Sequence, residues 1–203
     1  ILNIPKKKRL SSKKYRHVQT QELFVTDHPI GVSGNFTKDI QNIPSWIINW
    51  LKNNFINKKE IDKNLNNKIY IERESLLSKN NTIRSISNEE EVKLYLIKMG
   101  FTIVKLGEIS FREQANIFYN AECIIGLHGA AFANLAFCKP QTKVVELKSL
   151  TAGPVIENLA KKINLDYNSV TSEAEHTIKY DFPTQQGHIK VPISSLKKIL
   201  ENN

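Results

Sequence analysis

The stretch Cys123-Ile124-Ile125-Gly126-Leu127-His128-Gly129-Ala130-Ala131-Phe132-Ala133-Asn134 decides the fold, because it joins an apolar run to a glycine-containing turn and then to small residues. The run Cys123–Leu127 has the length of a strand inside a parallel sheet. Gly126 and Gly129 allow the backbone to turn tightly and approach a ligand, and the alanines allow a helix to lie close to the sheet. Free N–H groups at such a helix start attract anions. The stretch therefore predicts an anion-binding strand, turn and helix, with His128 in the turn.

The sequence on either side alternates between strand and helix patterns. Further strands are expected at 68–72, 101–106, 143–147 and 165–170, and helices from Asn88 to Gly100, from the capping-box pair Ser110 and Glu113, at 154–163 and at 191–201. In the helix after Asn88, the inward residues are expected to be Val92, Leu94, Tyr95 and Met99. Residues 171–190 are expected to be irregular. Such alternation predicts an α/β domain with a parallel sheet and right-handed crossovers.

The part of the chain before residue 68 follows no such alternation. Residues 17–25 are expected to form a short strand, and a helix is expected to bury a stripe made of Ile43, Ile47, Trp50 and Leu51, extended by Trp46 and Phe55. Residues 58–67 are rich in Asn and Lys and are expected to form a linker. We therefore divide the chain into a basic arm (1–16), a preceding segment with its linker (17–67) and the α/β domain (68–203).

Length and charge narrow the class of protein. A chain of 203 residues with 40% apolar residues can bury a core of its own, and it has no apolar run of membrane-spanning length. The net charge is +9, of which residues 1–16 carry +7 with no acidic residue among them. This arm resembles a nuclear-import cluster as well as an ordinary solvated end. Because no stacking platform or zinc-finger pattern accompanies it, we expect it to contact an anionic membrane surface or glycan and no specific nucleic acid.

Cysteine usage and the candidate ligands argue against a disulfide framework and a metal. Cys123 and Cys138 form no C-x-x-C pair, and no D-x-D pair or His/Cys cluster is present, so we expect no metal and no cofactor. Sequons at Asn35 and Asn80 point to a secretory compartment, whereas the lack of a disulfide framework favours a cytoplasmic or membrane-peripheral location. Because the sequence starts at Ile1 without a targeting segment, we expect it to be a piece of a longer polypeptide.

Ligands of parallel α/β sheets bind beyond the carboxyl ends of the strands. The residues expected there are Arg73, Glu74 and Ser75 after the first strand of the domain, Gly107 and Glu108 after the second, His128, Gly129 and Ala130 after the third, and Glu146 through Ser149 at the fourth. An arginine, an imidazole and a helix start suit phosphate groups, and a carboxylate suits a ribose diol. The sequence therefore predicts a site for a nucleoside diphosphate.

A larger set of residues resembles the C-terminal half of glycosyltransferase family 61, which includes capsular-polysaccharide-type enzymes. The likeness covers residues 68–150 well and the preceding strand and helix loosely. The residues that carry it are Arg73, Arg84, Asn88-Glu89, Gly100-Phe101, Glu113-Gln114, Ala121, Gly126, His128-Gly129-Ala130, Asn134, Phe137, Pro140 and Val145-Glu146-Leu147. The resemblance implies a GT-B fold in which this half, a Rossmann-like domain, holds a nucleotide-sugar donor, with inverting transfer and no bound metal. It also implies that residues 17–67 are a remnant of an N-terminal acceptor domain.

The predicted function is therefore transfer of a sugar, with inversion, from a nucleotide sugar to a glycan or protein acceptor, and UDP is the expected nucleotide. Arg73 and His128 are the expected catalytic residues and would stabilise the leaving diphosphate together with the N–H groups of Gly129 and Ala130. Glu146 is expected to orient the ribose. Asn134, counted among the binding residues, would fix the turn from inside the helix.

No paired carboxylates identify a general base, so we expect it outside this segment, with His28 as the second choice. Two other functions stay open, a catalytically silent nucleotide-sugar-binding module and a nucleic-acid-binding protein that uses the basic arm. Structural roles also stay open for individual residues. His128 could satisfy backbone groups, Glu146 could bond a neighbouring loop, and Arg84 could form a solvated pair with Glu89.

Overall fold

The core of the protein is a five-stranded parallel sheet. The computed structural model describes residues 5–11, 13–14, 17–22, 33–56, 67–73, 84–175 and 187–201. The strands are β1 (Lys68–Glu72), β2 (Thr102–Lys105), β3 (Cys123–Leu127), β4 (Lys143–Ser149) and β5 (Asp166–Ser172), in the order β2-β1-β3-β4-β5. Every neighbouring pair is parallel. The predicted α/β class is confirmed, and this strand order is that of a Rossmann-like, doubly wound fold.

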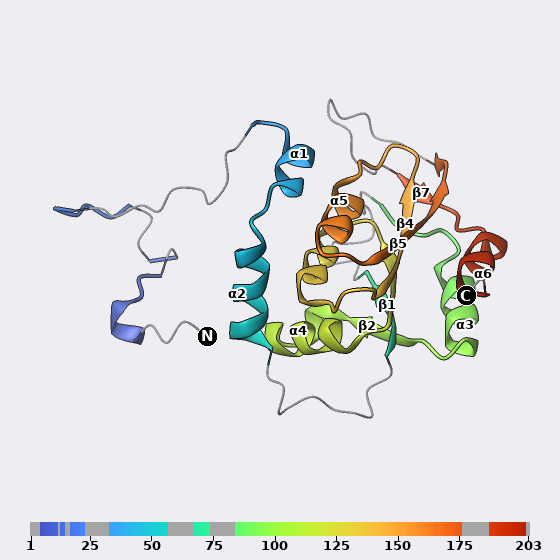
Figure 1. Cartoon of the computed structure of the whole chain (residues 1–203), viewed down its shortest axis with the longest axis horizontal. Coiled ribbons are helices and arrows are strands. Elements are labelled where there is room, and N and C mark those ends of the chain that lie inside the picture. The colour runs from blue at the N-terminus through green and yellow to red at the C-terminus, as the bar shows by residue number, and fades with distance from the viewer. Residues whose placement is uncertain are drawn as a thin grey trace.

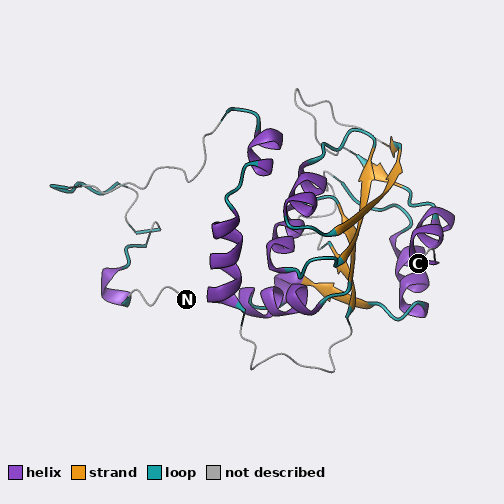
Figure 2. Cartoon of the chain, in the orientation of Figure 1, coloured by secondary structure: helices purple, strands orange, loops and turns teal. Residues whose placement is uncertain are grey.

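Helices cover both faces of the sheet (Figures 1 and 2). One face carries α3 (Glu89–Lys98) and α6 (Ile193–Glu201), and the other carries α4 (Phe111–Asn120), α5 (Val155–Lys162) and the 3-10 helix η3 (Ala130–Phe137). Each face has its own apolar core, with Phe118 and Phe132 on the α4 and α5 side and Tyr70 and Leu96 on the α3 side. A sheet buried on both faces explains why its central strands are almost wholly apolar.

Two helices that precede the sheet in sequence, α1 (Phe36–Gln41) and α2 (Ser45–Phe55), form a further layer outside α4 and α5 (Figure 1). Phe55 is buried in the core, and Lys52 Nζ donates to the Cys138 carbonyl at 2.6 Å. The helices α1 and α2 of segment 17–67 therefore pack on the α/β domain. The predicted buried stripe of α2 is wrong at Trp46 and Trp50, which are 60% and 42% exposed, because the helix turns Ile48 inward in their place.

The ends of the helices follow local sequence signals. Ser110 Oγ accepts a hydrogen bond from the Glu113 amide, and the Glu113 carboxylate accepts one from the Ser110 amide, which confirms the predicted capping box. Gly100, at φ +82°, lies in the left-handed region just after α3, as a glycine at a helix end does. Within α3 the prediction for Leu94 is wrong, because it is exposed and Leu96 is buried.

Several short elements complete the described part of the chain. They are the 3-10 helices η1 (Lys6–Lys8) and η2 (Leu106–Glu108) and the antiparallel pair β6 (Ala174–Glu175) and β7 (His188–Ile189). The last pair lies in the range expected to be irregular, of which residues 176–186 are outside the described residues. Residues 17–22 form no strand, contrary to prediction, and 23–25 are outside the described residues. None of the helices in the described ranges is long and apolar enough to cross a membrane.

Candidate functional site

The carboxyl ends of β1 and β3 form the point at which the strand order reverses. From β1 the chain continues to β2 on one side, and β3 lies on the other side of β1. In open α/β sheets a crevice at such a switch point is where ligands bind. Arg73 directly follows β1, and His128 directly follows β3. The structure therefore brings these two predicted site residues to the same edge of the sheet.

Two arginines converge on Gly129. A methyl group placed on Gly129 would lie 3.4 Å from Arg84 Nη2 and 3.8 Å from Arg73 Nη1. Burial lowers the pKa of both guanidinium groups, and the charge of Arg73 lowers the pKa of Arg84 further. Arg84 Nε is buried and has no hydrogen-bond partner, and no described carboxylate forms an ion pair with either arginine. Two neighbouring guanidinium groups without a carboxylate partner among the described residues have the chemistry to bind an anion.

The glycines of the turn are needed for space. Gly126 has Ile71 Cβ 3.2 Å from the position that a methyl group would take, so a larger residue there would have to displace Ile71 of β1 slightly. Gly129 has an extended backbone, with φ 167° and ψ −178°, which any residue can adopt. The predicted tight glycine turn is therefore an extended one, and the absence of a side chain at Gly129 gives the guanidinium groups access to the backbone.

Residues from far along the chain are bonded to the segment that directly follows Arg84. We call residues 187–191 the C-terminal brace. Ile189 forms a parallel β-bridge with Ile86, two residues after Arg84. The Asn88 side chain donates to the Val191 carbonyl and accepts from the Val191 amide, both at 2.9 Å. Asn88 is the N-cap residue of α3, as predicted, but it uses its side chain for the brace and not for the first amides of the helix.

His128 is bonded to a carboxylate that has no exposed surface. Its Nδ1 is hydrogen-bonded to Glu146 Oε1, and Tyr167 Oη donates to the other oxygen, Glu146 Oε2. Lys148 Nζ lies 3.6 Å from Glu146 Oε2 and donates to Tyr167 Oη at 3.1 Å. Burial and the bond to Glu146 raise the pKa of Tyr167, so its hydroxyl stays protonated. We call these four residues the Glu146 network.

The other predicted site residues have different surroundings. Both oxygens of Glu146 are occupied inside the protein, so a contact with ribose would require the carboxylate to be uncovered. Asn134 Nδ2 donates to Gln114 Oε1 at 3.0 Å, which ties η3 to α4. Gly107 and Glu108 lie in η2 after the edge strand β2. Ser75 lies outside the described residues, as does His28, and the ligand roles of all these residues stay predictions.

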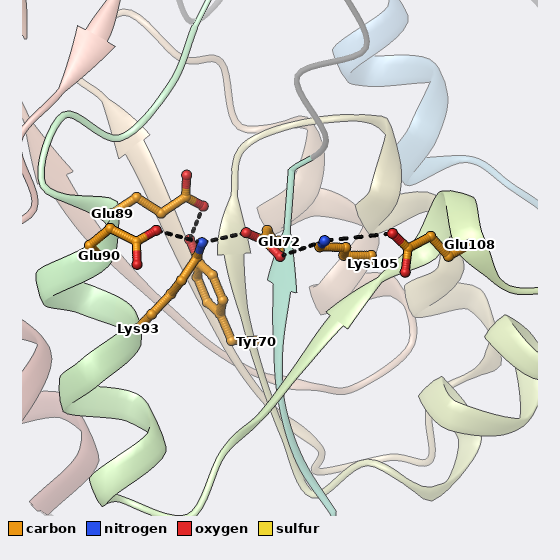
Figure 3. Close-up of polar contacts among 7 residues, drawn as sticks. All are labelled: Tyr70, Glu72, Glu89, Glu90, Lys93, Lys105 and Glu108. Carbon is orange, nitrogen blue, oxygen red and sulfur yellow. Dashed lines mark hydrogen bonds and ion pairs between the residues drawn. The ribbon is translucent and has the colours of Figure 1, made fainter.

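A second polar group lies on the α3 face of the same sheet edge (Figure 3). Lys93 forms ion pairs with Glu72 and, at 2.9 Å, with Glu90, and Lys105 lies 4.0 Å from Glu72 and 3.5 Å from Glu108. Although burial lowers it, these hydrogen bonds raise the pKa of Lys93 above its ordinary value. We call the ion-paired residues the Glu72 network.

Next to the Glu72 network, Tyr70 Oη donates to Glu89 Oε1 at 2.8 Å. Burial raises the pKa of Glu89, and this effect outweighs the hydrogen bond and Lys93, which lower it. Glu89 is therefore bonded to Tyr70 and not to Arg84, with which a solvated pair had been the alternative.

Sequence reasoning missed Tyr167 and undervalued Arg84, and it included Lys148 only within the range 146–149, without a role. Lys148 could have been found from the strand period, because it lies two residues after Glu146 and so on the same face of β4. To predict the contact of Tyr167 with Glu146, one would need the register between β4 and β5, which no short sequence pattern reveals. The described residues contain no group of three or more His, Cys, Asp or Glu side chains that could hold a metal ion.

A doubly wound parallel sheet with cations at its switch point defines a Rossmann-like α/β protein. The family model Glycosyltransferase 61 matches residues 2–145 of the chain. The chain belongs to glycosyltransferase family 61, as its sequence predicted, and the family implies glycosyl transfer between a donor and an acceptor. A search of curated proteins finds no match for it. The family match ends at Val145, so Glu146, Lys148 and Tyr167 lie beyond the matched residues.

Proposed function

We propose that this chain binds a nucleotide-sugar donor, with UDP as the nucleotide, and transfers the sugar with inversion to a glycan or protein acceptor. The single observation that supports this is the pair Arg73 and Arg84, which converge on Gly129 without a described carboxylate partner. In this proposal the chain is the donor-binding half of a GT-B enzyme, and a further domain supplies most acceptor contacts.

A diphosphate suits this pair of arginines better than other ligands of a Rossmann-like sheet. Each guanidinium group presents a fork of N–H donors that matches two phosphate oxygens. Partial burial already disfavours the charged form of both groups, and a bound anion would relieve that cost. The amides of Ala130 and Ala131, at the start of η3, have no partner within the helix and directly follow Gly129 in the sequence.

The same groups support departure of the nucleotide. In an inverting displacement the bond from the sugar C1 to the β-phosphate oxygen breaks, and the electron pair stays on that oxygen. Arg73 and Arg84 together supply two positive charges where this negative charge develops. That is the charge a divalent cation would otherwise supply, so we propose a transfer that does not depend on metal. His128 would add a third donor only with a proton on Nε2.

Binding of UDP, ADP and GDP to the full chain, measured by calorimetry and thermal shift, tests the proposal. UDP is expected to bind most tightly. Arg84→Ala and Arg73→Ala should each weaken UDP binding at least about tenfold, whereas Arg112→Ala, an exposed arginine on α4, should leave it unchanged. Chelator should have no effect. A clear preference for adenine, or no nucleotide binding, would overturn the donor assignment.

Release of UDP from a panel of UDP sugars separates an enzyme from a silent binding module. An active transferase is expected to release UDP slowly to water and faster when its acceptor is present. A chain that binds UDP sugars but releases no UDP under either condition would be a binding module.

A further inference from the structure

We infer that His128 is the group that accepts the proton of the acceptor hydroxyl, and that Glu146, Tyr167 and Lys148 are positioning residues that keep its Nε2 unprotonated for that task. The chemical step rests on the proposed function. The protonation state of the imidazole does not, because it follows from the hydrogen bonds and the charge balance of the Glu146 network.

The directions of these hydrogen bonds start from Lys148. An ammonium group only donates, so Tyr167 Oη accepts from Lys148 Nζ, at 3.1 Å. The hydroxyl proton of Tyr167 is then directed to Glu146 Oε2, which also has Lys148 Nζ at 3.6 Å. Two donors at one carboxylate oxygen stabilise the ionised form of Glu146. The Glu146 side chain has no exposed surface, so no water replaces these donors.

The state of His128 follows from an ionised Glu146. Oε1 of the carboxylate can only accept, so Nδ1 of His128 carries a proton and donates it. Lys148 already balances the charge of Glu146, so the imidazole is not needed as a counter-ion. A neutral imidazole with its proton on Nδ1 has a lone pair on Nε2. No residue in the described ranges is bonded to Nε2, and His128 keeps 13% of its side chain exposed.

The position of His128 suits a base. It directly precedes Gly129, and the guanidinium groups of Arg73 and Arg84 both lie beside Gly129, so the base is one residue from the backbone that the leaving-group cations approach. In the step, the acceptor oxygen bonds to C1 of the sugar while its proton moves to Nε2. The C1 to phosphate-oxygen bond breaks, and its electron pair leaves with the diphosphate. Glu146 then stabilises the imidazolium, which returns the proton to water.

Nitrogen NMR of the full chain, labelled with ¹⁵N-histidine, tests the protonation state without any substrate. His128→Gln identifies the resonance among the five histidines. At neutral pH we expect a neutral imidazole protonated on Nδ1, both in the free chain and with UDP added. In Lys148→Met the counter-ion of Glu146 is lost, and His128 is expected to become an imidazolium. Lys161→Met, which removes an exposed lysine of α5, is the matched control and should change nothing.

Two results would overturn the inference. One is a parent chain in which Nε2 of His128 is protonated at neutral pH. The other is a Lys148→Met chain that folds and leaves the His128 resonances as in the parent, because Lys148 would then have a structural role only. If Lys148→Met does not fold, Tyr167→Phe is the second variant, and it should shift the Nδ1 proton resonance of His128.

Binding and turnover separate a base from a donor to the leaving group. If His128 is the base, His128→Gln should keep UDP affinity within about twofold of the parent. The same variant should lower UDP release from a UDP sugar at least about a hundredfold. An equal loss of UDP affinity in His128→Gln and Arg84→Ala would assign His128 to the leaving group. If UDP does not bind the parent at all, the proposed function fails, and the NMR result still decides the state of His128.

Discussion

The two faces of the sheet carry similar polar residues at the same edge and arrange them differently. On the α4 and α5 face, Glu146 is wholly buried and its network ends at His128, which is partly exposed. On the α3 face, Glu72 keeps 17% of its side chain exposed, and its network continues to Glu90, which is 83% exposed. The first network encloses its charges and opens at an imidazole. The second reaches the surface at Glu90 and joins α3 to β1 through the ion pair of Lys93 with Glu72.

This difference shows that burial determines whether an ion pair fixes the protonation state and geometry of its members. A charge with no access to water depends wholly on its partners, so the partners fix its protonation state and geometry. A charge at the surface is solvated whether or not it is paired, and its pairing adds little to stability. Only the enclosed network can hold a neighbouring imidazole in one protonation state.

The largest expected effect comes from removing the central carboxylate of each network. Glu146→Leu leaves Lys148 enclosed without a counter-ion and should lower the free energy of unfolding by about 3 kcal/mol or more. Glu72→Leu is the matched change and should cost about 1 kcal/mol, because Lys93 keeps the exposed carboxylate of Glu90 as an ion-pair partner. Urea denaturation of both variants measures the two values. Equal losses would break the comparison.

Removing one tyrosine hydroxyl from each face should have a smaller effect. Tyr167→Phe takes a donor from the Glu146 carboxylate and an acceptor from Lys148, so we expect a loss of about 2 kcal/mol. Tyr70→Phe removes the bond to Glu89, whose carboxylate is partly solvated, and should cost about 1 kcal/mol. A larger loss for Tyr70→Phe, by denaturation under the same conditions, would contradict the order.

The pH dependence of stability sharpens the comparison further. Burial raises the pKa of Glu89, so the folded state retains a proton that the unfolded state releases. Its contribution to stability therefore falls as pH rises from the unfolded value, about 4.3, through the raised folded value. Glu89→Gln keeps an acceptor for Tyr70 and should raise the free energy of unfolding at pH 7 by less than about 1 kcal/mol. That gain should vanish at pH 3, and a gain that persists there would have another cause.

The smallest effect on stability is expected outside both networks. Within the arm, η1 has no buried residue, so deletion of residues 1–14 should change the free energy of unfolding by less than about 0.5 kcal/mol. The same deletion removes positive charge and should weaken adsorption to anionic lipid vesicles. Replacing Lys197 and Lys198 of α6 with glutamine is the control, because it removes charge elsewhere. A large loss of stability on deletion would show that the arm packs on the domain.

The strands were predicted well from the sequence, because a strand that is buried on both faces of a sheet is a continuous run of apolar residues. The run Cys123–Leu127 is buried at all five positions, as expected of an interior strand. Helix faces were predicted less well. Trp46 and Trp50 suggested a buried stripe on α2, but the face that a helix buries depends on what it packs against, here α4 and η3.

The candidate site was predictable only where one residue follows one strand. Arg73 and His128 were placed by that rule alone. The partners of Glu146 were not, because a carboxylate in a strand looks the same in sequence whether ligand or protein occupies it. Tyr167 reaches Glu146 from β5, whose register with β4 is set by the whole sheet. The role of Glu146 toward a ligand therefore stays a prediction.

The C-terminal brace has a consequence for how the protein is made. The bridge between Ile86 and Ile189 joins residues 103 positions apart in the sequence, so it can close only after Ile189 has been synthesised. During synthesis β1 to β5 emerge before Ile189 does, and domains tend to fold as their residues emerge. The sheet can thus assemble while Arg84 still lacks its anchor. A chain that has emerged only as far as β5 would hold the strands of the sheet without the bridge that lies two residues after Arg84.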